Sequence, residues 1–69
     1  MYHKYRTTHA GDLILFNLED YQPYEPENCL YESYYFSDIV IGGKEVDYED
    51  LTSREYAAMV EAVEEGAQL

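Results

Sequence analysis

The chain has 69 residues, with 15 acidic and 4 basic side chains, and its formal net charge is −11 at pH 7. This length predicts one domain, residues 1–69, whose small core leaves little room for a deep substrate pocket. The scarcity of Lys and Arg argues against direct binding to nucleic acid and to anionic membranes, because both need basic side chains.

The cysteine content and the length of the apolar runs limit the expected cellular location. Cys29 is the single cysteine, so an intramolecular disulfide is excluded, and a reducing cytoplasm is the expected location. The longest apolar run, residues 13–16, is far too short to span a membrane. Cys29 itself is expected to be a small, half-buried residue.

The first half of the chain predicts two strands. Residues 1–12 are typical of a short edge strand followed by a turn at "HAGD". Residues 13–21 alternate as a strand, with Ile14, Phe16 and Leu18 on one face. The two prolines of "QPYEPEN" then prevent regular pairing and favour an extended loop.

A glycine pair predicts a hairpin in the second half. Gly42 and Gly43 separate two β-rich runs, which is the pattern of a two-residue hairpin turn. The resulting register pairs Ile39 with Val46, Val40 with Glu45, and Ile41 with Lys44. It also places Asp38 opposite Asp47, where two carboxylates repel each other unless solvent or a partner relieves them.

The stretch "YESYYFSD", residues 31–38, interleaves tyrosines with carboxylates. Regular alternation puts Tyr35 on the inward face that continues into Ile39, and it puts Tyr34 and Asp38 on the solvated face. The tyrosines expected in the core are Tyr35, Tyr48 and Tyr56. Those expected to be exposed are Tyr21, Tyr24, Tyr31 and Tyr34.

The C-terminal segment predicts an amphipathic helix. Thr52 fits the N-cap, Glu55 fits the third helical position of a capping box, and Gly66 fits the position after the C-terminal end. Its apolar face consists of Tyr56, Met59, Val60 and Val63. The expected fold is therefore α+β, a small antiparallel sheet of three or four strands with one C-terminal helix packed on one face.

No pattern in the chain predicts catalysis, a metal site or a cofactor. Cys29 has no histidine nearby in sequence, and "GGK" between two short strands is not a phosphate-binding loop. The carboxylates of "DYEDLTSRE" lack the central glycine and the terminal glutamate of a calcium-binding loop. His3 and His9 are expected to be tail residues, with weak metal binding as the alternative.

What remains is a combination of acids and tyrosines. Carboxylates can take the place of phosphates toward a partner's Arg and Lys, and tyrosines are enriched at interface hot spots. The acids expected to form the centre of a protein-binding face are Asp38, Glu45, Asp47, Glu49 and Asp50. Three helix glutamates, Glu61, Glu64 and Glu65, would extend this face, and Tyr31 or Tyr34 would anchor it. The alternative is that the acidity serves only solubility.

The layout from "YQPYEP" through "IVIGGKEVDYEDL" to "EYAAMVEAVEEG" resembles short phage open reading frames. Small, acidic, cysteine-poor chains with an antiparallel sheet and one helix resemble phage-encoded inhibitors of host enzymes. These include inhibitors of uracil-DNA glycosylase, anti-restriction DNA mimics and anti-CRISPR proteins. The resemblance covers residues 13–66 in composition and layout. It implies a non-enzymatic blocker of a basic, nucleic-acid-binding host protein, acting in the host cytoplasm.

Two other functions stay open at this point. One is a small structural or assembly subunit, with a homodimer formed through the strand at residues 13–18 or through its edge. The other is an acidic domain that binds a metal or acts as an enzyme.

Overall fold

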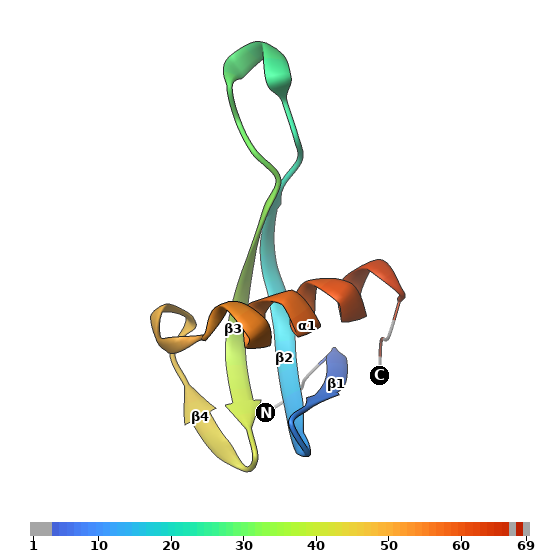
Figure 1. The fold of residues 1–69 in the computed structure, drawn as a ribbon, viewed down its shortest axis with the longest axis vertical. Coiled ribbons are helices and arrows are strands. Elements are labelled where there is room, and N and C mark those ends of the chain that lie inside the picture. Colours follow the sequence, from blue (N-terminus) through green and yellow to red (C-terminus); the bar gives the residue numbers. More distant parts are fainter. Residues whose placement is uncertain (1–3, 67, 69) are drawn as a thin grey trace.

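The computed structural model describes residues 4–66 and 68, and these form one sheet and one α-helix (Figure 1). The strands pair antiparallel in the order β1-β2-β3-β4, and the helix α1 crosses one face of the sheet. This arrangement confirms the predicted α+β fold. The elements are β1 Tyr5–His9, β2 Asp12–Gln22, β3 Ser33–Ile41, β4 Lys44–Val46 and α1 Ser53–Glu64, with 3-10 turns η1 Pro26–Asn28 and η2 Tyr48–Asp50.

Tight turns join the strands at the end of the sheet away from the β2–β3 connection. Gly42 and Gly43 have φ angles of 59° and 84°, the left-handed pair that a type I′ hairpin turn requires. Ala10 and Gly11 adopt a similar pair of angles, 52° and 83°, between β1 and β2. The predicted hairpin is confirmed, because Ile39–Ile41 of β3 pair with Lys44–Val46 of β4 in the expected register.

One expected pair of that hairpin does not form. The prediction placed Asp38 opposite Asp47, but β4 ends at Val46 and Asp47 precedes the turn η2. Asp38 also leaves the regular strand conformation, with a φ angle of 51°. The two carboxylates are therefore not cross-strand neighbours, and their repulsion in the ladder is avoided.

Two bulges interrupt the pairing of β2 with β3. Leu15 pairs with Val40, but Asn17 pairs with Ser37, so β3 carries one extra residue there, at Asp38. Farther along, the register shifts back, because β2 carries one extra residue at Glu19. Each extra residue reverses the alternation of the strand that contains it.

The bulge at Asp38 overturns the predicted faces of "YESYYFSD". Tyr34 and Phe36, not Tyr35, share the inward face with Ile39. Tyr34 is only 7% exposed, whereas Tyr35 is 48% exposed. The prediction for these two tyrosines was wrong because it assumed an unbroken period of two through residue 38.

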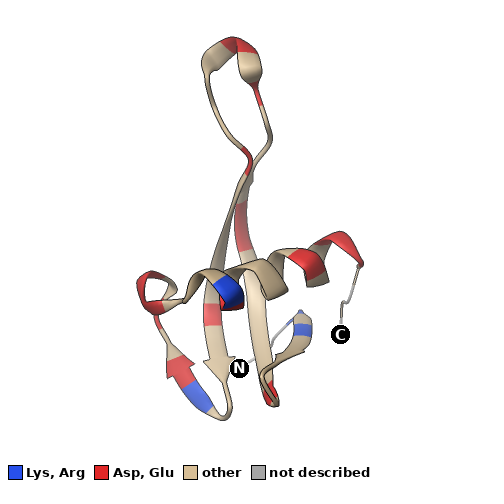
Figure 2. Cartoon of the chain, viewed as in Figure 1, with Lys and Arg blue, Asp and Glu red and all other residues tan. Residues whose placement is uncertain are grey.

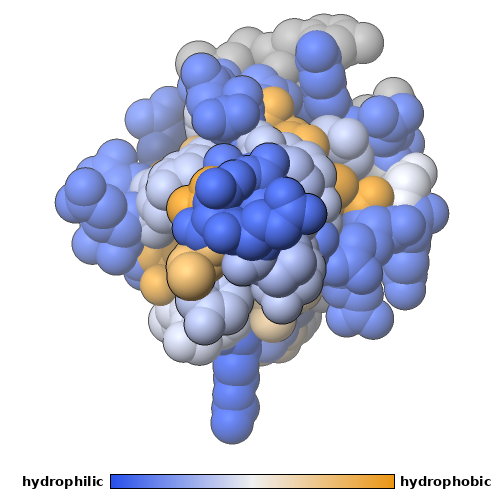
Figure 3. All heavy atoms as spheres, turned by 90° about the horizontal axis from the view of Figure 1, so that it is seen from above, coloured by the Kyte–Doolittle hydropathy of each residue, from blue (hydrophilic) through white to orange (hydrophobic). Residues whose placement is uncertain are grey.

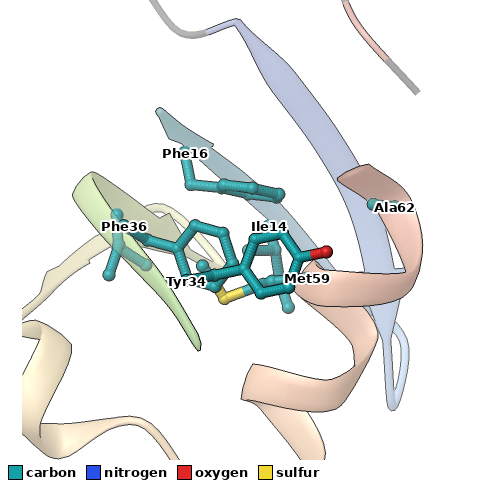
Figure 4. Close-up of a cluster of buried hydrophobic side chains, with 7 residues drawn as sticks. Ile14, Phe16, Tyr34, Phe36, Met59 and Ala62 are labelled. Atoms are coloured by element: carbon teal, nitrogen blue, oxygen red, sulfur yellow. The ribbon is translucent and has the colours of Figure 1, made fainter. Parts of the chain in front are cut away.

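The core lies between the sheet and α1 (Figure 4). Phe16 packs at its centre, with its ring 4.9 Å from that of Phe36 in an edge-on geometry and 5.5 Å from that of Tyr5. Each fully buried large side chain contributes about 1.5–3 kcal/mol to stability. The buried residues are Ile14 and Phe16 from β2, Tyr34, Phe36 and Ile39 from β3, and Met59 and Ala62 from α1.

The helix has the ends that the sequence predicts. The Thr52 side chain accepts a hydrogen bond from the backbone N–H of Glu55, and Glu55 accepts one from the backbone N–H of Thr52, which completes the capping box. At the other end Gly66 adopts a φ angle of 73° after the helix. Tyr56, Val60 and Val63 pack against the core as predicted, but Ala62 is buried there as well.

The β2–β3 connection projects away from the rest of the molecule (Figure 1). We call residues 19–33 the arm, and the remaining described residues the body. The arm begins at the β2 bulge, and its strands are held together at Gln22–Ser33 and, nearer the end, by a bridge between Glu25 and Leu30. The loop predicted from the two prolines is therefore an extension of the hairpin, closed by η1.

Candidate protein-binding surfaces

Part of the predicted acidic face gathers at one end of the body. Asp38, Glu45 and Asp47 line a shallow hollow of about 250 Å³, whose remaining wall is apolar and comes from β3 and β4. Glu49 and Asp50 follow in the turn η2, and all five side chains are exposed. The structure therefore brings three of the five predicted carboxylates around one concavity, with the other two next to it in the chain.

Asp38 has a structural role in addition. Its carboxylate accepts a hydrogen bond from the side-chain N–H of Asn17 at 3.2 Å. The side-chain oxygen of Asn17, Oδ1, accepts one from the backbone N–H of Lys4 at 2.8 Å. This chain of contacts ties the β3 bulge to the central strand and to the start of β1. A substitution at Asp38 therefore tests the fold as well as any binding.

The three helix glutamates lie apart from that hollow. Glu61, Glu64 and Glu65 lie at the C-terminal end of α1, and the turn η2 lies at its N-terminal end (Figure 2). Glu61 and Glu64 follow Ser53, the first residue of the helix, by roughly 12 and 17 Å along the helix axis. An extension of the face from η2 to these glutamates would therefore have to follow the length of the helix.

Basic side chains interrupt the acidic end of the body. Lys44 lies in β4 and Arg54 in the first turn of α1, on either side of the predicted acids (Figure 2). Their charges offset part of the field of Glu45 and of the η2 carboxylates. The body as a whole holds all four Lys and Arg residues of the chain, against ten acids.

The structure places one of the two predicted anchors at the surface. Tyr31 lies in the arm and is 81% exposed, the highest value among the large hydrophobic side chains of the described residues. Tyr34 was wrongly expected to be exposed, and it lies in the core for the reason given above. Tyr34 therefore cannot contact a partner without unfolding of the core.

Sequence reasoning missed the arm itself as a surface. Of the six exposed large hydrophobic side chains in the described part of the chain, four lie there, namely Tyr21, Tyr24, Leu30 and Tyr31. The arm also carries five carboxylates and no Lys, Arg or His, so its formal charge is −5. The signal that pointed to it was the spacing of two prolines between strands, which indicated a loop but not its projection from the body.

The base of the arm is held by Tyr21. Its hydroxyl donates a hydrogen bond to Glu32 across the hairpin at 2.8 Å, and its ring lies 4.8 Å from that of Tyr34. The hydrogen bond to the Glu32 carboxylate, followed by burial and by the charge of Glu32, raises the pKa of Tyr21 to about 12. This contact connects the arm to the core of the body.

The end of the arm has its own closure. Glu25 and Leu30 exchange two backbone hydrogen bonds, of 2.9 and 3.0 Å, and the Asn28 amide donates to the Glu25 carboxylate at 3.2 Å. Cys29 follows η1 with a left-handed φ of 57° and is exposed, so its expected half-burial was wrong. Between the base and this closure, no backbone hydrogen bond of the described residues joins residues 23–24 to 31–32.

The titratable side chains of the described residues are not gathered into a buried cluster. None of its polar or charged side chains is buried, and no group of three or more His, Cys, Asp or Glu residues is placed to hold a metal ion. His9 lies in β1, and His3 lies outside the described residues. Within residues 4–66 no helix is long and apolar enough to cross a membrane.

Two tyrosine hydroxyls protect the outer edge of β3 where β4 does not reach. The Tyr56 hydroxyl accepts a hydrogen bond from the backbone N–H of Tyr34 at 3.0 Å. The Tyr48 hydroxyl donates one to the backbone carbonyl oxygen of Tyr34, also at 3.0 Å. Burial, followed by the nearby hydroxyl of Tyr56, raises the pKa of Tyr48 above its ordinary value. These bonds satisfy backbone groups that would otherwise pair with another strand.

Comparison of the chain with protein-family models, with curated proteins and with solved structures finds no match. The functional argument therefore depends on the surfaces described above.

Proposed function

We propose that the chain is a non-enzymatic inhibitor, of the phage-encoded kind, that binds another protein and blocks its basic, nucleic-acid-binding site. The blocked protein would be a defence or DNA-processing protein of the host. The observation that carries this proposal is the state of the carboxylates. They are exposed or half-buried, and the hydrogen bonds that those of the described residues accept come from neutral donors, such as Asn17, Tyr21 and Asn28.

Carboxylates in this state remain available to a partner. A charge-assisted bond from Arg or Lys to a carboxylate is roughly twice as strong as a neutral hydrogen bond. A net charge of −11 on so small a chain also attracts a positively charged cleft over a distance and raises the association rate. The resemblance in composition and layout to phage inhibitors that act as DNA mimics supports the same function.

The experiment is a pulldown with the tagged protein from a bacterial lysate at low salt, with elution by a salt step and identification by mass spectrometry. We expect one stoichiometric DNA- or RNA-processing protein, released by salt because screening weakens exposed charge pairs. A matched variant carries Asp47→Asn and Asp50→Asn and keeps the five carboxylates of the arm and the three glutamates of the helix. It measures the contribution of the η2 end to binding. Recovery of the bait alone would contradict the proposal.

A second function has one observation in its favour. Leu13 and Tyr35 are exposed on the face of the sheet opposite α1, and this face could contact a second copy in a small assembly subunit. A homodimer through the backbone edge of residues 13–18 is disfavoured, because β2 is an inner strand paired with β1 and β3. Sedimentation separates the two functions, since an apolar self-complex persists in high salt and a charge-steered complex does not.

A further inference from the structure

We propose that the arm, rather than the acidic end of the body, enters the partner's site, and that the partner presents arginine side chains to it. This inference rests on the proposed function and specifies which surface performs it. The surface consists of the rings of Tyr24 and Tyr31, the side chain of Leu30 and the carboxylates of Glu25, Glu27 and Glu32.

The shape of the molecule favours the arm. The molecule measures 40 × 23 × 21 Å, and the arm projects along the longest axis (Figure 1). Five residues of extended chain, 21–25, lead to the turn η1 at the end of the arm, a reach of roughly 16 Å. Sites that bind nucleic acid are grooves or channels whose walls concentrate the positive field. A narrow arm can enter such a groove, whereas the rounded body can only cover its opening.

The rings of Tyr24 and Tyr31 in the arm are free to bind. Tyr24 is 61% exposed and Tyr31 is 81% exposed, and neither ring packs against another ring of the described chain. Figure 3, which looks along the arm toward the body, shows hydrophilic atoms at the arm's end with hydrophobic atoms beside them. Large aromatic side chains that lie outside the core bring contact area at a small cost in conformational entropy, which is typical of binding hot spots.

Tyrosine rings and carboxylates on one arm select arginine over lysine. A guanidinium is planar, so it can stack on a tyrosine ring, and it can also form two hydrogen bonds to a carboxylate. An ammonium group is a compact charge and does neither with the same geometry. Consecutive side chains of an extended segment point to opposite sides, so Glu25 and Glu32 lie across the narrow arm from the rings of Tyr24 and Tyr31. A groove that surrounds the arm can present guanidinium groups to both sides.

The backbone of the arm allows these groups to adjust. Tyr24 and Tyr31 lie in residues 23–24 and 31–32, which form the open window between the paired base and the closed end of the arm. Segments with few backbone bonds and few buried contacts open at low free energy. The window is nevertheless limited on both sides, by the contact of Tyr21 with Glu32 and by the bridge between Glu25 and Leu30.

The body offers a poorer match to a basic groove. Its acidic end includes Lys44 and Arg54, which would face the partner's own basic residues. The arm has no basic residue, and its carboxylates are spaced among rings. The charge of −5 on 15 residues is thus the part of the acidic field that a cationic groove can surround most completely.

The test uses fluorescent oligo-arginine and oligo-lysine peptides of equal length as probes, with binding to the full chain measured by anisotropy at low salt. We expect the wild type to bind oligo-arginine at least about fivefold more tightly than oligo-lysine. Tyr24→Ser with Tyr31→Ser should abolish this preference without a change in charge. Equal affinity of the wild type for the two peptides would overturn the inference.

Two charge-matched variants locate the contact. Glu25→Gln, Glu27→Gln and Glu32→Gln should weaken oligo-arginine binding about tenfold. Replacing Glu61, Glu64 and Glu65 by Gln removes the same charge from the body and should weaken binding only about twofold. Equal weakening by both triple variants would show a diffuse field and would overturn the inference. Circular dichroism checks that each variant folds.

The two proposals fail in different ways. If a nucleic-acid-binding partner is recovered from the lysate and only the body variants abolish its capture, the arm inference is wrong and the proposed function stands. If the arm binds oligo-arginine as expected and the lysate yields only the bait, the proposed function is wrong and the arm remains a surface for arginine-bearing partners.

Discussion

The arm and the body use tyrosine in opposite ways. In the body, Tyr34 is buried, and Tyr48 and Tyr56 pack around it and bond its backbone groups. In the arm, Tyr24 and Tyr31 extend into solvent. Tyr24 and Tyr31 therefore add little to the stability of the fold, whereas Tyr34, Tyr48 and Tyr56 enclose one side of the core.

The contrast teaches that the molecule separates stability from recognition. A domain of this size has a total stability on the order of 5 kcal/mol, so most of its large apolar side chains are needed in the core. Four large side chains placed instead on a projecting hairpin leave a substantial apolar surface in water, which is characteristic of interaction sites. Tyr21 joins the two regions, since it contacts Tyr34 on one side and Glu32 on the other.

The largest expected effect separates the regions by stability. Phe16→Ala removes a fully buried ring and should lower the free energy of unfolding by about 3–5 kcal/mol, enough to unfold much of the protein. Tyr31→Ala should change it by less than about 0.5 kcal/mol, because the side chain is exposed. Urea unfolding followed by circular dichroism measures both. Similar losses in the two variants would show that the arm is part of the core structure.

The bulge that sets the inward face is the next test. Asp38 has a left-handed φ of 51°, which a β-branched residue adopts only with strain. Asp38→Val should therefore lower stability by about 1–3 kcal/mol. Asp38→Asn is the matched control, because Asn tolerates this conformation and its oxygen can still accept the bond from Asn17. If the two variants unfold at the same temperature, residue 38 does not need the left-handed conformation of the bulge.

The tyrosine hydroxyls at the β3 edge should have a smaller effect. Tyr48→Phe and Tyr56→Phe each remove one hydrogen bond to the backbone of Tyr34 and should cost about 0.5–1.5 kcal/mol. Tyr35→Phe serves as the control, since its exposed hydroxyl has no such role. Hydrogen exchange of the Tyr34 amide should quicken in Tyr56→Phe alone, because only Tyr56 accepts from it. Unchanged exchange would contradict this assignment.

The smallest effect concerns the junction of the arm with the body at alkaline pH. The folded protein raises the pKa of Tyr21 from 10.0 to about 12, chiefly through the hydrogen bond to Glu32. The neutral phenol is thus favoured by the fold, so its stabilising contribution is complete below pH 10 and is lost as the pH rises from 10 to about 12.

A nuclear magnetic resonance titration of the Tyr21 ring carbons measures this pKa directly. In Glu32→Ala both the acceptor and its charge are removed, so the pKa of Tyr21 should fall toward 10.0. If Tyr21 titrates at the same pH with and without Glu32, the contact across the base of the arm is not present in solution.

Much of the fold could be predicted from local patterns. The capping box at Thr52, the glycine turn at Gly42 and the alternation of Ile14 with Phe16 each depend on neighbouring residues alone. The candidate site could be predicted only in part. Tyr31 and the acids around Asp47 were placed correctly on the surface, but their grouping was not, because it depends on how α1 and the arm are oriented.

The sequence by itself determined the elements, their order and the excess of negative charge, because spacing, capping and turn chemistry act over a few residues. Only the tertiary structure decided which tyrosines are buried. The packing of Ile39 and Phe36 under α1 requires one extra residue at Asp38, and this bulge turns Tyr34 inward and Tyr35 outward. The projection of the arm is likewise tertiary, since α1 crosses the strands instead of following them and leaves the hairpin beyond the body uncovered.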